Sequence, residues 1–308
     1  MSASATTAVA VRRGRMSIAT RNQIMGLLFI SPWLIGLLAF TAYPVLASLY
    51  YSFTLYDIIN PAQFIGLQNY IFMFTQDPTF PITVFNTMYL VIIGVPCGLV
   101  VSFLLANLLN NSVKGRPFFR TIFFLPSIVP VIATAMVWLW IYNPNYGIIN
   151  ATLAAIGLQV VPWLSSPDLA KFSIIIIGVW GQGAAIVIFL AALQDVPREL
   201  YDAAKVDGAG AFRRFKDVTI PLCTPSVLFV LITGLIGAFQ EFSLAWILTR
   251  GGPMQSTTFY AVYLYQSAFQ FFKMGYASAL AWVLFLIIVT FTAITFRTSA
   301  RWVYYAGS

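Results

Sequence analysis

Polar side chains in residues 225–248 are the best placed for chemistry, because this segment is otherwise strongly apolar. Thr233, Gly237 and the pair Gln240 and Glu241 recur at spacings of three and four, which puts them on one stripe of a helix. A carboxylate costs about 2–3 kcal/mol at the centre of a bilayer, so Glu241 is expected to face a water-filled cavity or a partner. The stripe predicts a polar pathway. The alternative is that these residues serve helix–helix packing or pairing with another subunit.

A second polar position, Gln182, lies in the apolar segment 170–193 between Gly181 and Gly183, where the backbone is open to close approach. Its amide can line the same pathway or bond a neighbouring helix. Covalent catalysis is not expected, because the chain has no histidine and Glu241 alone supplies no paired base and nucleophile. The two cysteines are far apart, so neither a metal site nor a disulfide is predicted.

The elements that must position these residues are membrane spans. The 308 residues are 60% hydrophobic and only 8% charged, whereas a soluble domain is about 45–50% apolar and 25% charged. A span needs about 20 apolar residues. The sequence therefore predicts an all-α integral membrane protein with six transmembrane helices. The segments that qualify are 24–50, 84–109, 119–142, 170–193, 225–248 and 276–296.

The distribution of basic residues predicts the orientation of these spans. Of the 17 Lys and Arg residues, 14 lie before the first span, between the second and third, between the fourth and fifth, or after the sixth. The other three are Lys171, Arg250 and Lys273. By the positive-inside rule both termini and the segment between spans four and five are cytoplasmic. The net charge of +8 thus reflects the positive-inside distribution, so membrane lipid is an expected partner and nucleic-acid binding is not expected.

The domain organisation follows from the same pattern. Residues 1–22 are small, polar and basic and predict a disordered cytoplasmic tail, and residues 23–308 predict the transmembrane domain. Because the first span is long and lacks a cleavage site, it is expected to remain as an anchor. On the external side, residues 148–161 predict a helix lying at the membrane surface. Nearby aromatic residues suit an interfacial belt, namely Trp138, Trp140, Tyr142 and Trp163.

The cytoplasmic segment 195–221 interrupts the apolar chain with ten charged residues. It predicts two short helices around a turn at residues 207–210. The first is expected to start at Pro197 with Asp195 as its cap, and Pro221 is expected to end the second. Phe212 and Phe215 are predicted to share a face of the second helix. An ordinary solvated loop is the alternative, but the length of the segment and its aromatic residues favour a covering partner.

Within this segment the sequence DAAKVDGAGAFRRFKDVTIP resembles the EAA loop of binding-protein-dependent ABC importer permeases. The matching residues are Asp202, Ala203, Ala204, Asp207, Gly208, Ala209, Phe215, Ile220 and Pro221. Asp202 stands where the family usually has Glu. The resemblance implies that this loop forms coupling helices that insert into a cleft of a cytoplasmic ATPase subunit.

Three further stretches, FIGLQNY (64–70), FFLPSIVP (123–130) and LTRGGP (248–253), resemble the carbohydrate-uptake branch of this family. The resemblance implies a permease subunit of the bacterial or archaeal cytoplasmic membrane that translocates an oligosaccharide or related polyol by alternating access. It also implies a second permease subunit, an ATPase dimer and an extracytoplasmic sugar-binding protein as partners. The chain has no GxxxxGK[ST] phosphate loop, so ATP and Mg are expected on the partner ATPase and no cofactor on this chain.

The same resemblance implies a substrate pathway through three spans. The positions that match the maltose-type permeases are Ser127, Val131, Gly178, Gly181, Ala185, Thr233, Ile236 and Gly237. Several are smaller than the family's usual residues, which implies a different sugar or a larger share of contacts from the companion subunit. Sugars bind through hydroxyl-bonding groups and flat aromatic faces, which makes Trp180 a candidate platform, although a lone Trp also serves packing.

Other functions leave different signatures. A permease for glycerol phosphate needs basic residues in its cavity, and the centres of the spans have none. A peptide remains a possible cargo. A secondary transporter would show repeated halves with broken helices in matching positions, which the sequence lacks. A membrane scaffold without a pathway would have no need for Gln240 and Glu241.

Overall fold

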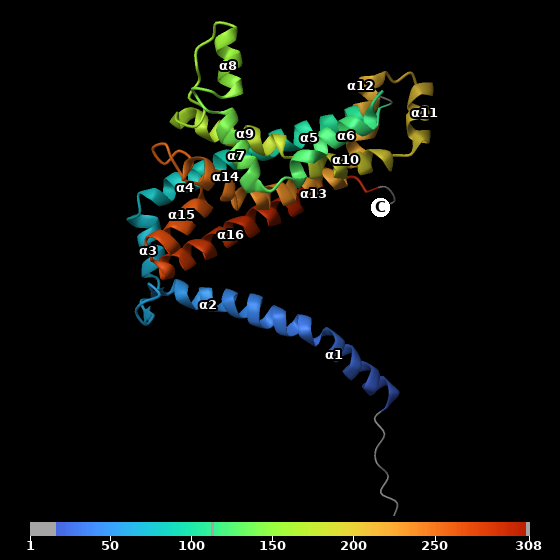
Figure 1. Ribbon diagram of the computed structural model, residues 1–308. Coiled ribbons are helices and arrows are strands. Elements are labelled where there is room, and N and C mark those ends of the chain that lie inside the picture. The colour runs from blue at the N-terminus through green and yellow to red at the C-terminus, as the bar shows by residue number, and fades with distance from the viewer. Residues whose placement is uncertain (1–16, 112–113, 306–308) are drawn as a thin grey trace, which may run out of the picture. The chain divides into compact units, whose positions relative to one another are not determined.

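The computed structural model describes residues 17–111 and 114–305, and helices dominate it (Figure 1). In the first part of the chain the elements are α1 (Ile18–Leu37), the π-helical turn η1 (Leu38–Ala42), α2 (Tyr43–Ser52), the strands β1 (Thr54–Leu55) and β2 (Gln63–Phe64), α3 (Gln68–Thr75), α4 (Thr79–Tyr89), the π-helical turn η2 (Leu90–Gly94) and α5 (Val95–Asn110). The central elements are α6 (Arg116–Ile128), α7 (Val131–Ile141), α8 (Ile148–Ala155), α9 (Pro167–Trp180), α10 (Gly183–Gln194), α11 (Arg198–Val206) and α12 (Ala211–Arg214). The last are the π-helical turn η3 (Phe215–Thr219), α13 (Ile220–Phe239), α14 (Ser243–Thr249), α15 (Tyr260–Tyr265), the π-helical turn η4 (Gln266–Gln270) and α16 (Met274–Ser299).

The chain divides into two units, residues 1–50 and 51–308. The described part of the first unit is one helical run, from α1 through η1 into α2. The run starts at Ser17, whose hydroxyl accepts a hydrogen bond from the Thr20 amide at 3.4 Å, a typical helix cap. Residues 18–22 of the expected disordered tail are therefore helical, and residues 1–16 lie outside the described residues.

Four helical runs are long and apolar enough to cross a membrane: Ile18–Ser52, Thr79–Asn110, Ala211–Phe239 and Met274–Ser299. Two bent pairs, α6 with α7 and α9 with α10, pass the same test when each pair is taken together. The structure therefore contains four spans, or six if each bent pair crosses once. Five of the six apolar segments expected from the sequence fall on these runs and pairs, and the fifth in chain order, 225–248, extends past the end of its run at Phe239.

The bend between α6 and α7 measures 104°, far more than the kink expected within a single span. Pro130 explains the break, because proline excludes helical geometry at the residue before it and Val129 is extended with ψ 131°. The bend between α9 and α10 is milder, at 46°, and falls at Gly181 and Gln182. Both breaks free backbone groups that a straight helix would satisfy, and such breaks are tolerated where protein or water lines the backbone.

The second helix of the segment 195–221 does not end at Pro221, which corrects the sequence expectation. Residues Ala211–Phe239 form one uninterrupted helix through α12, η3 and α13. Pro221 sits in the first turn of α13, directly after η3. Because η3 already shifts the hydrogen-bond register there, the missing proline amide does not stop the helix. The cytoplasmic segment and the fifth expected span are thus one element.

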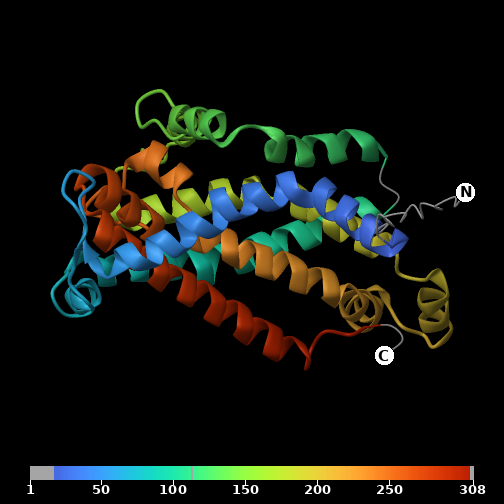
Figure 2. The ribbon, with the colours of Figure 1, turned by 90° about the horizontal axis from the view of Figure 1, so that it is seen from below.

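Three apolar clusters form the core of the second unit. One joins α7, α9 and α14 around Trp138, Ile174 and Ala245. Another joins α5, α10 and α13 around Phe103 and Phe189, whose rings meet edge to face at 5.2 Å. The remaining cluster packs α16 against α3, α4, α13 and α15. Figures 1 and 2 both place the segment 195–221 at the opposite end of this unit from the β1–β2 hairpin and α3, as opposite faces of a membrane would require.

Buried hydrogen bonds hold the elements together at the end of the unit that contains the β1–β2 hairpin. The Asn69 amide donates to the carbonyl oxygens of Ser52 and Thr54, each at 2.9 Å, which holds α3 against β1. The Asp77 carboxylate accepts from the Tyr263 hydroxyl at 2.7 Å and from the Tyr276 hydroxyl, which joins the start of α4 to α15 and α16. FIGLQNY, which contains Asn69, therefore has a structural role at this end.

Three of the four aromatic residues expected as an interfacial belt pack on one another, and the fourth, Trp140, is exposed. Tyr142 is buried, and its ring lies 5.0 Å from Trp138 and 5.5 Å from Trp163. The surface helix expected over residues 148–161 is shorter than predicted, because α8 ends at Ala155. After α8 the chain folds back toward it, because the Asn150 side chain donates to the Val161 carbonyl and accepts from the Val161 amide.

Candidate functional site: a pocket at the helix breaks and a cytoplasmic coupling segment

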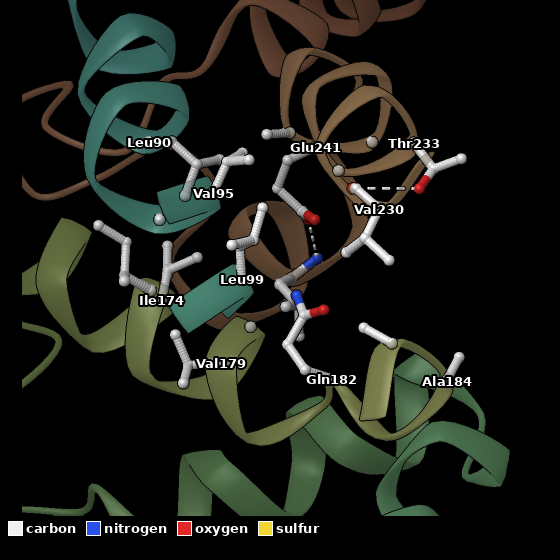
Figure 3. A pocket seen from close by; sticks show the side chains of 18 of the residues that line it. Leu90, Val95, Leu99, Ile174, Val179, Gln182, Ala184, Val230, Thr233 and Glu241 are labelled. Carbon is white, nitrogen blue, oxygen red and sulfur yellow. Dashed lines mark hydrogen bonds between the residues drawn. The ribbon is translucent and has the colours of Figure 1, made fainter. Parts of the chain in front are cut away.

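A cavity of about 370 Å³ opens in the second unit where three helices break or end (Figure 3). Its walls come from η2 and α5, from both sides of the α9–α10 bend, from the last turns of α13, and from α14. The lining is mainly apolar, and Gln182, Thr233 and Glu241 carry its polar side chains. Among the residues that the structure describes, no lysine or arginine lines it. A mostly apolar pocket with a few polar groups is the usual form of a small-molecule site.

Gln182 owes its position to the α9–α10 bend. It is the residue before the first turn of α10, and its amide points into the pocket (Figure 3). The side chain lies against Gly98 of α5, where a Cβ would approach the Gln182 Nε2 to 3.1 Å. Glycine at position 98 therefore leaves room for the amide. Among the described residues no hydrogen bond to this amide is seen, so its donor and acceptor face the cavity.

Glu241 does not lie in a helix, which corrects the predicted stripe. α13 ends at Phe239, Gln240 turns with φ −98°, and α14 begins at Ser243. The first amides of any helix lack partners within it. The Glu241 Oε1 accepts a hydrogen bond from the Leu244 amide at 2.9 Å and so satisfies one of them. Glu241 therefore caps α14 and lines the pocket at the same time (Figure 3).

Thr233 and Gly237 line the pocket from α13, as predicted for one face of that helix. The Thr233 hydroxyl donates to the Phe229 carbonyl at 2.9 Å, and its oxygen remains available as an acceptor. A Cβ at Gly237 or at Gly178, across the pocket on α9, would meet no atom within 4 Å. These glycines therefore mark open space and not a tight helix crossing.

The pocket collects only part of the predicted pathway. The predicted residues that line it are Gly178, Gln182, Ala185, Thr233, Gly237 and Glu241. The predicted residues outside its lining are Ser127, Val131, Trp180, Gly181, Ile236 and Gln240. Trp180 packs edge to face on Trp138 at 5.7 Å, as its packing interpretation predicted. Ser127 and Val131 flank the α6–α7 break, where the Ser127 hydroxyl donates to the Phe124 carbonyl at 2.7 Å.

Sequence reasoning missed the wall that η2 and α5 supply. Leu90, Gly94, Val95 and Leu99 line the cavity there. Their spacing of four, one and four residues places them on one helix face. They are apolar or lack a side chain, so nothing in their chemistry distinguishes them from lipid-facing residues. A search for a face containing glycine in the second expected span would have found Gly94.

The segment 195–221 contains the predicted turn. α11 ends with Gly208 in the left-handed region at φ +76°, its amide bonded to the Lys205 carbonyl. The Ala209 amide bonds the Ala204 carbonyl at 2.8 Å, which completes the paired bonds typical of a helix terminating at glycine. Asp195 does not cap α11, since Pro197 is the cap residue and makes no side-chain bond there; Asp195 instead ends α10.

One contact joins the two helices of this segment, and another joins the segment to α5. The Tyr201 hydroxyl of α11 lies 2.9 Å from the Thr219 hydroxyl of η3, and the Phe215 ring of η3 lies 6.0 Å from Phe103 of α5. Phe212 was expected to share a face with Phe215, but it is 78% exposed. Val206 is also exposed, at 88%. One face of the segment therefore packs against the spans through Phe215. Its other side exposes the apolar side chains of Val206 and Phe212 to solvent.

Charge within the segment is locally paired. The Lys205 ammonium bonds the Asp202 carboxylate at 2.7 Å, and both side chains are more than half exposed. The hydrogen bond and charge of Lys205 lower the pKa of Asp202 below its ordinary value. Stability from this pair is therefore present above the ordinary aspartate pKa and is lost only as the pH falls through the lowered one. Near neutral pH the Asp202 carboxylate is therefore ionised.

Comparisons with known proteins agree with this arrangement. Residues 94–303 match the family described as "Binding-protein-dependent transport system inner membrane component". The probable ABC transporter permease YesP of Bacillus subtilis is 42% identical over 289 residues, which cover 92% of this chain and 93% of that protein. The sulfoquinovosyl glycerol transport system permease SmoG of Agrobacterium fabrum is 36% identical over 279 residues, 90% of each.

A solved structure shows the same fold. A chain in the crystal structure of a bacterial ABC transporter involved in the import of the acidic polysaccharide alginate superimposes with a TM-score of 0.81. The match covers 92% of this chain and 96% of that one, at 23% identity. Both the family match and the curated relatives span most of the sequence. This chain therefore belongs to the family of binding-protein-dependent transport system inner membrane components, the permeases of ABC transporters.

Proposed function

We propose that this permease carries a neutral sugar, an oligosaccharide or related polyol, across the cytoplasmic membrane by alternating access. The observation that carries the proposal is the pocket of about 370 Å³ at the helix breaks, with Gln182, Thr233 and Glu241 on an otherwise apolar wall. Amide, hydroxyl and carboxylate groups can all bond sugar hydroxyls. Relatives whose names specify a cargo include the trehalose/maltose permease MalF of Thermococcus litoralis and the lactose permease LacF of Rhizobium radiobacter.

The charge of the pocket favours neutral cargo over the alternatives. No lysine or arginine lines it, and its one charged side chain is Glu241. A phosphate or carboxylate on the cargo would meet no cation and would lie near a carboxylate. Glycerol phosphate is thus disfavoured, although a relative, UgpA of Yersinia enterocolitica, is named for it. The proposed cargo site comprises the residues that line the pocket. The other residues predicted for the pathway do not line it and would contact the cargo only elsewhere along its route.

The proposed topology has six spans, with each bent pair crossing once and both termini cytoplasmic. Residues 1–22 form a basic tail and residues 23–308 the transmembrane domain, with the coupling segment 195–221 on the cytoplasmic side. The positions of the basic residues support this orientation. The placement of the coupling segment and the β1–β2 hairpin at opposite ends of the second unit also supports it.

Energy would come from a separate ATPase dimer that holds ATP and Mg, with no cofactor on this chain. A second permease would complete the pathway, and an extracytoplasmic binding protein would deliver the sugar. In this mechanism the ATPase contacts Asp202, Ala203, Ala204, Asp207, Gly208 and Ala209. The family name supports a binding protein, and the exposed Val206 and Phe212 support a covering partner.

The uninterrupted helix Ala211–Phe239 supplies the route from the ATPase to the pocket. Its cytoplasmic end belongs to the coupling segment, where Phe215 packs on Phe103, and its other end carries Thr233 and Gly237. A helix of this length moves as one body, so displacement of the coupling segment shifts the pocket wall. Closure of the ATPase dimer would in this way open and close the pocket.

Filling the pocket tests the function. Gly237→Leu adds a side chain into open space, so the complex should assemble while uptake of its sugar falls more than tenfold. Ala151→Leu is the control, because Ala151 is exposed on α8 of the same unit and α8 does not line the pocket. The measurement is uptake of labelled neutral saccharides and of glycerol phosphate by the complete transporter in proteoliposomes. Saccharide uptake by Gly237→Leu at the wild-type rate would contradict the proposal. So would a wild-type transporter that takes up glycerol phosphate and no saccharide.

A further inference from the structure

A second cavity lies on the outer side of α10, away from the cargo pocket. Its volume is about 310 Å³, and α6, α10 and the end of α5 enclose it. Its apolar lining includes Leu109, Phe124, Leu125, Ile128, Ile186 and Leu190. Arg120 and Thr121 are the polar residues of the lining. The cavity is therefore amphipathic, with one cation among apolar walls.

Arg120 is unusual because its guanidinium is covered but unpaired. Its Nε and one terminal nitrogen are buried without a hydrogen-bond partner. Among the described residues it forms no ion pair, and none of the nine acidic residues of the chain lines the cavity. Buried guanidinium nitrogens without an acceptor are costly, so such a group implies a missing anionic partner.

The preceding arginine on the same helix shows how such a group is normally satisfied. Arg116, one turn earlier, donates to the carbonyl oxygens of Asn110 and of Asn111, the latter at 2.8 Å. It thereby holds α6 to the end of α5. Arg120 has no such acceptor, although the two arginines lie four residues apart on one face. The chain therefore supplies acceptors to one terminal nitrogen of Arg116, whose Nε is also buried without a partner, and supplies none to the guanidinium of Arg120.

Close packing fixes the cavity. α6 crosses α10 at Gly183, where an added Cβ would lie 2.8 Å from both the Phe123 carbonyl oxygen and the Ser127 hydroxyl. The crossing holds the two helices together at one end of the cavity, and Arg120 lies toward the start of α6. Lys114 and Arg116 are close in sequence, which places the cavity at the basic, cytoplasmic end of the spans under the orientation proposed above.

We propose that this cavity binds one anionic phospholipid of the cytoplasmic leaflet, with its headgroup phosphate on Arg120 and an acyl chain along α6 and α10. A phosphate supplies the paired acceptor oxygens that a guanidinium fork matches. The apolar lining favours a lipid over a free phosphate ion, which would leave those walls unfilled. Basic pockets between membrane helices on the cytoplasmic side are known to bind anionic headgroups.

The test measures lipid retained by the intact transporter. The complex is purified in detergent, exposed to phosphatidylglycerol or phosphatidylcholine, and weighed intact by native mass spectrometry. Wild type should retain one phosphatidylglycerol in preference to phosphatidylcholine. Arg120→Gln should weaken that retention about tenfold, as expected for loss of a charge-assisted bond, and Arg120→Lys should restore part of it. Inorganic phosphate should not displace the lipid.

Two further variants separate the site from general surface charge. Arg297→Gln removes an exposed arginine at the end of α16 and should leave retention unchanged. Val187→Trp fills the cavity from the exposed side of α10 without touching any charge, and should abolish retention while the complex stays assembled. Equal losses in Arg120→Gln and Arg297→Gln would overturn the proposal. So would the absence of a headgroup preference in wild type, displacement by inorganic phosphate, or a side chain of the second permease occupying the cavity.

Discussion

At the scale of single residues, Glu241 combines two tasks that the sequence presents as alternatives. Its carboxylate lines the pocket, and it also accepts the Leu244 amide at the start of α14. A negative charge at a helix start is favourable, because the helix dipole and the free amides both attract it. The hydrogen bond to the Leu244 amide explains why an apolar region contains a carboxylate. The same carboxylate is one of the polar groups that line the pocket.

Glu241→Gln tests the cap. Glutamine keeps an acceptor but loses the charge, so the variant should lose about 1 kcal/mol of stability. Glu241→Ala should lose about 2 kcal/mol, because the Leu244 amide then has no acceptor. Thermal unfolding of the purified complex measures both. Gln240→Ala is the control, since Gln240 is exposed and does not line the pocket. Equal melting temperatures for all three variants would show that the cap contributes nothing.

Polar pocket residues could be predicted from the sequence because they are rare in apolar segments. Gln182, Thr233 and Glu241 stand out for that reason, and all three line the cavity. Leu99 and Val95 line it too, but an apolar side chain in a span fits lipid, protein or pocket equally well. Positions carried over from the maltose-type permeases, such as Ser127 and Val131, lie outside the lining because the α6–α7 bend of 104° redirects them.

At the scale of elements, the breaks between helices determine where the pocket lies, because its polar residues Gln182 and Glu241 both lie at a break. For five of the six expected segments the apolar pattern predicts the ends of the helical run or pair to within six residues, since hydropathy is set by composition. It cannot show that the fifth expected span stops at Phe239, because residues 243–249 are as apolar as those before the break. Nor does it show that Pro221 is accommodated, because η3 depends on packing of Phe215 and Thr219.

The turn at Gly208 gives an element-scale prediction. Gly208→Ala forces a side chain into the left-handed region and should cost about 1–2 kcal/mol. Gly208→Pro is incompatible with φ +76° and also removes the amide bonded to Lys205, so it should abolish uptake driven by ATP. Gly210 is the matched control: its φ of −65° suits any residue and a Cβ there meets nothing, so Gly210→Ala should transport normally. Normal uptake in Gly208→Pro would contradict a coupling role for this turn.

The crossing of α6 and α10 gives a second prediction at this scale. Gly183→Ala places a methyl group 2.8 Å from a backbone oxygen, which the helices can relieve only by separating. It should therefore cost about 1–3 kcal/mol. Gly178→Ala makes the same chemical change in α9 where nothing lies within 4 Å, and should stabilise the helix by up to about 1 kcal/mol. Melting temperatures that move in the same direction for both variants would contradict this packing.

At the scale of the whole molecule, the second unit places its two working regions at different ends of one helix. The coupling segment begins the run Ala211–Phe239, and the pocket lies at its far end. α11 does not belong to that run and joins it through Tyr201 and Thr219. A force applied to α11 must therefore pass through this contact, the turn at Gly208, or the packing of neighbouring apolar residues.

Tyr201→Phe tests how much of that force the hydroxyl contact carries. The variant keeps the apolar ring and removes one hydrogen bond, worth about 0.5–1.5 kcal/mol, so assembly should persist. The number of sugar molecules taken up per ATP hydrolysed should fall about two- to tenfold, because α11 then moves partly independently of η3. Thr219→Val should give a similar loss, and the double variant should be no worse than either single variant if both act through one bond. Tyr146→Phe, in an exposed loop far along the chain from this contact, is the control and should not change the ratio. Additive losses in the double variant would mean that the two side chains act separately, and the transmission route would then lie in the Gly208 turn.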